Sequence, residues 1–482
     1  MTGLGATVRA SPPGSLIAAG VLASAALGIA MGFLGSSGQV ILGLLLVTLV
    51  PVLAIMAVRA PEAAVGLIVF AQIFEWLEVQ SPLGTISPSI IALMIFLIVR
   101  LPDVVPTMWA RGYGLPVASF GVFVAAHALQ FLHADAAQAA RQLITAASFA
   151  AYGLLGMYIG SRRAHLVAAA VGAGAVLLVS GTLALASNAG VTIVASTLSP
   201  PREILGIMSP FLRSYGVPGV LVALLLPLCI PALVLYASSS GSPAVMRAGA
   251  LTAVALIGLA SLFLFQSRSM VLEIAIAVML VVGLTGRRFG VGMLVIGLCL
   301  GVAVVIGLTL TGSTDPIGNQ FREESYSTAI TFFAGDPQRA LLGTDPSAFR
   351  VMVNAATTLG HLIPADAPTH NLLIETIVVG GVAGALALLV LAFSAPARAL
   401  RMASRVGRFS GTMTVMLAAA IMAILEVAVT PAVANSAGFW MTMGWCAAVG
   451  ASVAHAPASM PPPEGVLPSS RQAIQPVEPS RW

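Results

Sequence analysis

The chain has 482 residues, of which 58% are hydrophobic and 8% are charged, with a mean hydropathy of +1.01 and a net charge of +5. This composition excludes a soluble domain of ordinary surface chemistry, because too few polar side chains remain to cover a surface in contact with water. The sequence therefore predicts a polytopic membrane protein.

Apolar runs in the chain are continuous rather than alternating, which indicates spanning helices and not membrane strands. Each span needs about 20 apolar residues, since the hydrocarbon core is about 30 Å thick and a helix rises about 1.5 Å per residue. The fold class that we predict is all-α, a polytopic bundle of about 12–14 transmembrane helices with one large periplasmic loop. In chain order, the expected helices lie at residues 16–35, 40–58, 63–79, 87–99, 114–132, 144–161, 166–186, 217–238, 246–265, 270–286, 291–311, 372–394, 411–430 and 434–455.

The arginines give the orientation, because the chain contains no lysine. Cytoplasmic loops of membrane proteins carry an excess of basic residues. Every second loop, on the side that also holds both termini, contains arginines, so we assign that side to the cytoplasm. These arginines are Arg9, Arg59, Arg100, Arg111, Arg162, Arg163, Arg247, Arg287, Arg288, Arg398, Arg401, Arg405 and Arg408.

The outer loops carry most of the acidic residues, and the longest of them spans residues 312–370. A connection of that length is usually functional, and we expect one or two short amphipathic helices in it, over an outer cavity. We expect residues 1–455 to form a single transmembrane domain and the proline-rich residues 456–482 to form a disordered cytoplasmic tail. Acidic residues within helices fall near the outer ends and indicate a polar outer vestibule; they are Glu75, Glu78, Glu273, Glu375 and Glu426.

The sequence Pro368-Thr369-His370-Asn371 stands where the long outer loop leads into a helix, and Gly380-Gly381-Val382-Ala383-Gly384 follows within that helix. Histidine has the side chain whose ordinary pKa lies nearest neutrality, so a histidine at this junction can accept a proton from a sugar hydroxyl. His370 is therefore a candidate general base. The alternative is a histidine that caps the helix or only lies at the interface.

Two outer arginines lie beside apolar helices, Arg268 within residues 266–269 and Arg213 within residues 211–216. An arginine in such a place needs an anion, and a lipid diphosphate provides one through bidentate, charge-assisted hydrogen bonds. For Arg268 the alternatives are a pair with Glu273 or a snorkelling position at the interface. For Arg213 the alternative is a plain interfacial arginine.

The long loop and the helix after it supply a set of accessory candidates: Arg322, Arg339, Arg350 and Glu375. Arginines among acidic residues are also typical of a solvated surface whose charges pair with one another, so that alternative stays open for the three loop arginines. The outer loops contain no pair of aspartates with the spacing of a divalent-metal site, and we predict no metal site.

Together these motifs resemble the O-antigen ligase and Wzy-type polysaccharide polymerase superfamily of membrane glycosyltransferases. The resemblance covers roughly residues 200–400 and is carried by four segments: His370–Gly384, Ser267-Arg268, Arg213–Gly219 and Arg339–Pro346. The order of these segments and their shared side of the membrane make the set more specific than any one of them. Two departures from the family pattern, at Thr344 and at Val217-Pro218-Gly219, concern acceptor binding.

The resemblance implies a donor of the undecaprenyl diphosphate oligosaccharide class at the outer, periplasmic face of a bacterial inner membrane. It implies that Arg213 and Arg268 hold the diphosphate and that His370 is the general base of an inverting transfer with no metal or other cofactor. The acceptor is a second lipid-linked repeat in a polymerase, which we favour, or lipid A core in a ligase. A polymerase would have a chain-length regulator as a further partner, and no nucleic-acid partner is expected.

Two alternatives come from other classes of protein. One is a transporter of the same lipid-linked sugars, and the other is a non-catalytic assembly partner. A transporter would show repeat symmetry, charges near the bilayer midplane and helices broken there, and the sequence indicates none of these.

Overall fold

The structure, a computed structural model, describes residues 50–72, 79–81, 84–86, 88–110, 113–188, 203–204, 207–208, 229–237, 243–259, 268–285, 316–358, 371–406, 411–429 and 437–455. This part of the chain is almost entirely helical, which confirms the predicted fold class at that level. Its first helices are Val50–Arg59, α3 (Pro61–Ala71), α4 (Pro88–Ala110), α5 (Gly114–His127), the 3-10 helix η2 (Ala128–Leu132), α6 (Ala136–Gly160) and α7 (Arg163–Asn188). The later helices are α9 (Ile230–Ala237), α10 (Ala244–Leu259), α11 (Arg268–Thr285), α13 (Pro316–Gly335), α14 (Pro337–Leu342), α15 (Pro346–Ala356), α16 (Leu372–Val406), α17 (Gly411–Val429) and α19 (Ala437–His455).

The only extended segments among the described residues are two short antiparallel hairpins. In the first, β1 (Val79–Ser81) pairs with β2 (Gly84–Ile86), and in the second, β3 (Glu203–Ile204) pairs with β4 (Ile207–Met208). Each hairpin has two strands of two or three residues, too short to form a layer of the fold.

Three described helical segments are long and apolar enough to cross a membrane, Gly114–Leu132, Ala136–Gly160 and Leu372–Ser404. They coincide with expected helices at 114–132, 144–161 and 372–394, although α6 begins earlier, where the Asp135 carboxylate accepts a hydrogen bond from the Gln138 amide at 2.9 Å. The chain is therefore a membrane protein by the length and composition of its helices. The expected helices at 16–35 and 291–311 lie outside the described residues.

The expected helix at 87–99 is present, but its expected end is wrong, because α4 continues to Ala110 through Arg100, Pro102 and Pro106. The charge of Arg100 does not end the helix, since its guanidinium donates to two backbone carbonyls near the end of the helix Val50–Arg59. These bonds run from Nε to Ala57 O at 2.6 Å and from Nη2 to Val58 O at 3.1 Å. An arginine that caps a neighbouring helix can therefore lie inside a longer one.

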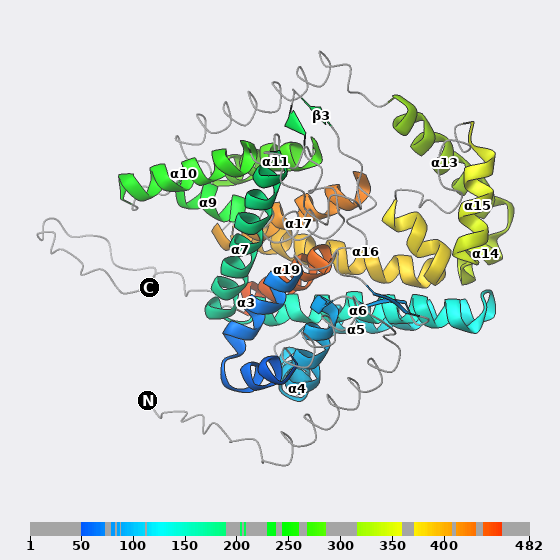
Figure 1. Cartoon of the computed structure of the whole chain (residues 1–482), viewed down its shortest axis with the longest axis horizontal. Coiled ribbons are helices and arrows are strands. Elements are labelled where there is room, and N and C mark those ends of the chain that lie inside the picture. Colours follow the sequence, from blue (N-terminus) through cyan, green and yellow to red (C-terminus); the bar gives the residue numbers. More distant parts are fainter. Residues whose placement is uncertain are drawn as a thin grey trace, which may run out of the picture.

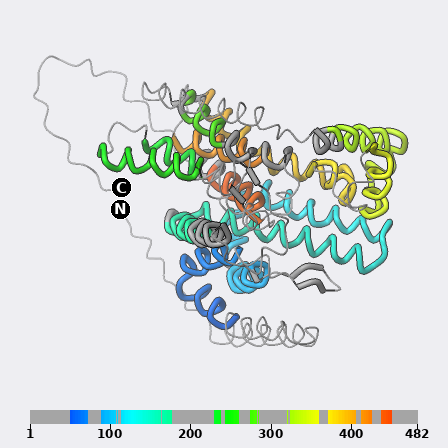
Figure 2. The backbone as a smooth tube through the Cα atoms, turned by 45° about the horizontal axis from the view of Figure 1, so that its top comes forward, coloured from blue at the N-terminus to red at the C-terminus, as the bar shows by residue number. Residues whose placement is uncertain are grey.

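The core of the bundle is a close contact between α6 and α19, which run in the same direction. A Cβ at Gly156 would overlap the backbone of Met441, and a Cβ at Gly160 would overlap the Cβ of Ala448. Small residues allow membrane helices to approach in this way. The ring of Trp440 in α19 is fully buried and stacks on the ring of Phe149 in α6, with the ring centroids 5.2 Å apart. Helix α5 runs beside α6 along the molecule (Figure 2).

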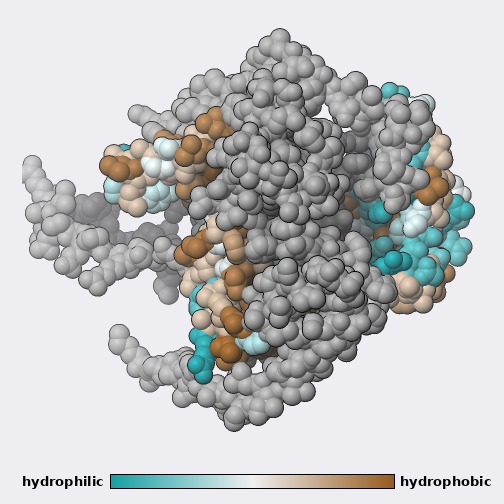
Figure 3. Space-filling view, in the orientation of Figure 1, coloured by the Kyte–Doolittle hydropathy of each residue, from teal (hydrophilic) through white to brown (hydrophobic). Residues whose placement is uncertain are grey.

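Helices α13, α14 and α15 lie together at one end of the molecule, beyond the amino-terminal ends of α6 and α16 (Figure 1). They have a small core of their own, separate from the main one, formed by Ala329, Phe349 and Val353 with Val378 and Val379 of α16. Figure 3 shows hydrophilic side chains gathered over this end of the molecule. The first turns of α16 thus pack with the segment of the chain that we expected to form the outer loop.

Candidate functional site

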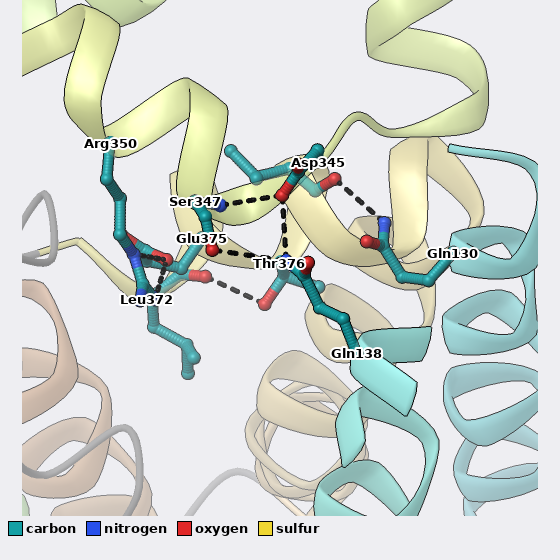
Figure 4. A network of polar contacts seen from close by, with 9 residues as sticks. Gln130, Gln138, Asp345, Ser347, Arg350, Leu372, Glu375 and Thr376 are labelled. Atoms are coloured by element: carbon teal, nitrogen blue, oxygen red, sulfur yellow. Dashed lines mark hydrogen bonds and ion pairs between the residues drawn. The ribbon is translucent and has the colours of Figure 1, made fainter. Parts of the chain in front are cut away.

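Two of the residues that the sequence singles out, Arg350 and Glu375, lie at a junction where α14 and α15 approach the first turns of α16, η2 and the beginning of α6. Figure 4 shows the polar contacts there, which join side chains from α6, η2, α15 and α16. The junction is built from two parts of the chain that are far apart in sequence, residues 128–160 and residues 337–406. Its geometry therefore depends on tertiary hydrogen bonds rather than on one local motif.

Arg350 of α15 and Glu375 of α16 form an ion pair across this junction. The guanidinium donates to one carboxylate oxygen, Oε2, from Nη2 at 2.7 Å and from Nε at 3.3 Å. The side chains are 29% and 14% exposed, respectively. Glu375 also lies in the first turn of its helix, where the helix dipole favours a negative charge.

The amino-terminal cap of α16 is Asn371. Its side-chain oxygen accepts hydrogen bonds from the backbone amides of Leu373 at 3.0 Å and Ile374 at 3.2 Å. Asparagine is one of the preferred residues at this position because its oxygen satisfies amides that have no partner within the helix. The helix that follows the Pro-Thr-His-Asn motif is thus capped by the asparagine side chain.

Helix α16 is broken at Gly381, which has φ +59° and ψ −166°. The break receives the turn between α14 and α15. Gly343, with φ +83°, precedes Thr344, whose amide donates to Val378 O at 2.7 Å. A side chain at Gly381 would overlap the carbonyl of Leu341, so the turn approaches the break at backbone distance. Both glycines have a positive φ, a conformation that the Cβ of an L-residue disfavours, so glycine is the residue suited to both positions.

The side chain of Gln130, fully buried in η2, lies against the carbonyls at this break. Its Nε2 is 2.7 Å from Val379 O, 3.1 Å from Thr344 O and 3.4 Å from Val378 O. An amide nitrogen carries two hydrogens, so the two shorter contacts are its hydrogen bonds and the third is a weak shared one. One side chain thus bonds both the broken helix and the α14–α15 turn.

A second glutamine, Gln138 of α6, holds the start of α15. Its Nε2 donates to Asp345 Oδ1 at 2.7 Å and to Ser347 Oγ at 3.2 Å. The same Asp345 oxygen caps α15 by accepting from the Ser347 amide at 2.9 Å. Because Gln138 bonds the cap rather than α16, it fixes α15 to the bundle independently of the break.

Polar contacts within the α13–α15 unit itself stabilise its side away from the bundle. The Glu324 carboxylate accepts from the amide and hydroxyl of Thr358, both at 2.7 Å, and from Gln320 at 2.8 Å. These hydrogen bonds, first among them the one from Gln320, hold the pKa of Glu324 below its usual value. Arg339 pairs with Asp336 at 2.9 Å, and its guanidinium lies 4.7 Å over the ring of Phe332.

The structure brings together only part of the set that the sequence proposes. Glu375 and Arg350 are in contact, and Arg339 lies in the same unit with a partner of its own. Arg322 lies in α13 and Arg268 begins α11, but their side chains, like all of His370 and Arg213, lie outside what the structure describes. The described part of the chain holds no group of three or more His, Cys, Asp or Glu residues placed to bind a metal ion.

The polar side chains on the bundle side of the junction, of which Gln130 and His127 are buried and Gln138 is half-buried, were not predicted from the sequence. Gln130 lies at the end of the expected helix 114–132, and Gln138 follows the turn after it. Neither glutamine belongs to a sequence motif. His127, one turn before Gln130, is also buried, with Nδ1 2.7 Å from Phe123 O and its ring beside Gly380. A glutamine and a histidine three residues apart in an apolar helix were the available signal, since polar groups in a membrane bundle are usually paired and functional.

No protein-family model, curated protein or solved structure matches this chain. The relationship to a glycosyltransferase family therefore stays a proposal that rests on the motifs.

Proposed function

We propose that this protein is a membrane glycosyltransferase that polymerises lipid-linked oligosaccharide repeats at the outer face of a bacterial inner membrane. The donor is an undecaprenyl diphosphate oligosaccharide, and the acceptor is a second lipid-linked repeat. The reaction is inverting and needs no metal. Membership of the O-antigen ligase and polysaccharide polymerase superfamily is part of the same proposal.

One observation carries the proposal furthest, the capping of α16 by Asn371. A histidine that caps the helix was the simplest alternative role for His370, and the asparagine oxygen already fills that role. His370 directly precedes Asn371 in the chain, at the start of a helix whose first turns are fixed by Glu375 and Arg350. This supports a chemical role for His370.

In the proposed reaction, His370 takes the proton of the acceptor hydroxyl as that oxygen attacks the anomeric carbon of the donor sugar. The new glycosidic bond forms as the bond from the anomeric carbon to the diphosphate oxygen breaks, and undecaprenyl diphosphate leaves with the electron pair. Arg213 and Arg268 stabilise the charge that develops on the diphosphate. Arg350 is neutralised by Glu375 and Arg339 by Asp336, so we assign these two arginines to positioning and not to the diphosphate.

The positions of the arginines support the proposed orientation. Arg398 and Arg401 lie in the later part of α16, away from the α13–α15 end, and Arg162 follows α6 on the same side. The excess of basic residues on cytoplasmic sides supports a periplasmic position for α13–α15.

A transporter of lipid-linked sugars is the second candidate, because transporters often use broken helices and α16 is one. The discriminating experiment compares His370→Ala with His361→Ala, a second histidine of the same loop, in cells that make a polysaccharide. Our proposal requires that His370→Ala still exports lipid-linked repeats but does not extend them, while His361→Ala does both. Loss of export in His370→Ala would favour the transporter. Transfer of single chains to lipid A core in the wild type would identify a ligase.

A further inference from the structure

The break in α16 leaves backbone carbonyls without their helical partners in the interior of a membrane protein. Val378 O and Val379 O would accept from amides in the next turn of a continuous helix, and the turn at Gly381 removes those donors. Buried carbonyls without partners are strongly unfavourable in a bilayer, so the break persists only if other groups bond them. The groups that do so are the amide of Thr344 and the side chain of Gln130.

Of these two donors, only Gln130 belongs to the bundle. Thr344 follows α14 and lies in the same outer unit as the first turns of α16. Gln130 lies in η2, which continues α5 as one membrane-spanning segment. The Nε2 of Gln130 is therefore the hydrogen-bonding link, at the break itself, between the spanning bundle and the unit that carries Arg350 and Glu375.

We propose that Gln130 is a positioning residue that sets the orientation of residues 371–380 relative to the bundle. His370 is bonded directly to Asn371, so a tilt of this segment moves the proposed base relative to a diphosphate held by Arg213 and Arg268. The side chain is fully buried, and its Oε1 has no hydrogen-bond partner in the described part of the chain, so Nε2 alone determines how the amide is held. For its consequence on activity, this inference rests on the proposed function.

The test is amide hydrogen exchange on the purified full chain in detergent, with Gln130→Met as the variant and Gln138→Met as its matched control. Methionine has nearly the same length as glutamine but donates no hydrogen bond. We expect exchange in peptides covering residues 376–386 and 340–346 to be about tenfold faster in Gln130→Met, because two hydrogen bonds to buried carbonyls are lost. In Gln138→Met, we expect faster exchange at the start of α15 and an unchanged rate at residues 376–386.

Unchanged exchange at residues 376–386 in Gln130→Met overturns the inference. If Gln130→Met instead raises exchange throughout α6 and α19, Gln130→Asn decides, since it keeps the amide and shortens its reach. A rise confined to the break in Gln130→Asn supports positioning, and a general rise in that variant as well overturns it. These outcomes do not depend on any enzymatic activity.

The activity measurement separates a positioning role from a merely structural one. In a transfer assay with an undecaprenyl diphosphate oligosaccharide, Gln130→Met should lower kcat at least tenfold and leave the KM for donor within about twofold, because the donor arginines are untouched. Equal kcat in the variant and wild type overturns the inference. If the wild type makes no product, the proposed function fails, while the exchange result still decides whether Gln130 orders the break.

Discussion

The contribution of the ion pair between Arg350 and Glu375 to the free energy of unfolding can be derived from the geometry and burial of the pair. Two donors of Arg350 converge on one oxygen of Glu375, and the side chains are 29% and 14% exposed. Exposed pairs contribute about 0.2–1 kcal/mol, and removing one partner of a fully buried pair costs about 3–5 kcal/mol. For a partly buried pair we expect a coupling free energy of about 1–2 kcal/mol.

The assay is a double-mutant cycle of Arg350→Met, Glu375→Gln and the combined variant. Denaturant unfolding of the purified protein in micelles, followed by tryptophan fluorescence, gives the change in the free energy of unfolding, and the cycle removes effects that do not belong to the pair. The control cycle uses Arg339→Met and Asp336→Asn, a pair whose side chains are 48% and 41% exposed. We expect less than about 0.5 kcal/mol for the control. A coupling for Arg350 and Glu375 no larger than the control would refute the reasoning from burial.

Three further predictions concern the break, a carboxylate and the main helix contact. Gly381→Ala should lower the free energy of unfolding by about 2 kcal/mol or more, because its φ of +59° disfavours a side chain and a carbonyl of α14 occupies the space. Gly384→Ala, where a side chain would make only ordinary contacts, should have a much smaller effect in the same denaturant unfolding assay. The lowered pKa of Glu324 means that its hydrogen bonds stabilise the fold above the ordinary glutamate pKa of about 4.3 and that this stabilisation is lost as the pH falls through the folded pKa. The protection factor of the amides at the end of α15, which is corrected for the intrinsic exchange rate at each pH, should therefore fall below about pH 4.3 in the wild type and not in Glu324→Gln. Equal pH profiles of the protection factor in the two proteins would contradict this. Gly156→Ala should lower the free energy of unfolding in detergent by about 2 kcal/mol, since its Cβ would overlap the backbone of α19. Gly174→Ala, with open space around it, should be neutral or raise the free energy of unfolding by up to about 1 kcal/mol. Similar losses in both variants would exclude close packing as the cause.

The helical class and several helix boundaries could be predicted from sequence, because apolar length is a local property of the chain. The segment Gly114–Leu132 and the starts of α16 and α17 were found where the pattern placed them. The end of α4 was not, since a sequence pattern cannot show that Arg100 bonds the carbonyls of an earlier helix. Such an end is decided by a tertiary contact.

Some features of the site could also be predicted from the sequence, and others could not. The Pro-Thr-His-Asn motif and the glycines after it were visible in the sequence, and they mark the cap and the break of α16. The break itself was not predicted, because the residues around Gly381 have the pattern of a continuous helix. The helix is interrupted by tertiary contacts, the backbone of the turn at Gly343 and the side chain of Gln130. Gln130 and Gln138 carry no motif, and only the fold shows that Gln130 bonds the α14–α15 turn and Gln138 the start of α15.

The most direct test of the proposed glycosyl transfer uses purified protein, an undecaprenyl diphosphate oligosaccharide and EDTA, and compares the wild type with His370→Ala and His361→Ala. We expect a ladder of extended products from the wild type and from His361→Ala, and none from His370→Ala. Equal product formation by His370→Ala would contradict a role for His370 as the base. No product from the wild type with a native donor would contradict the proposed transferase.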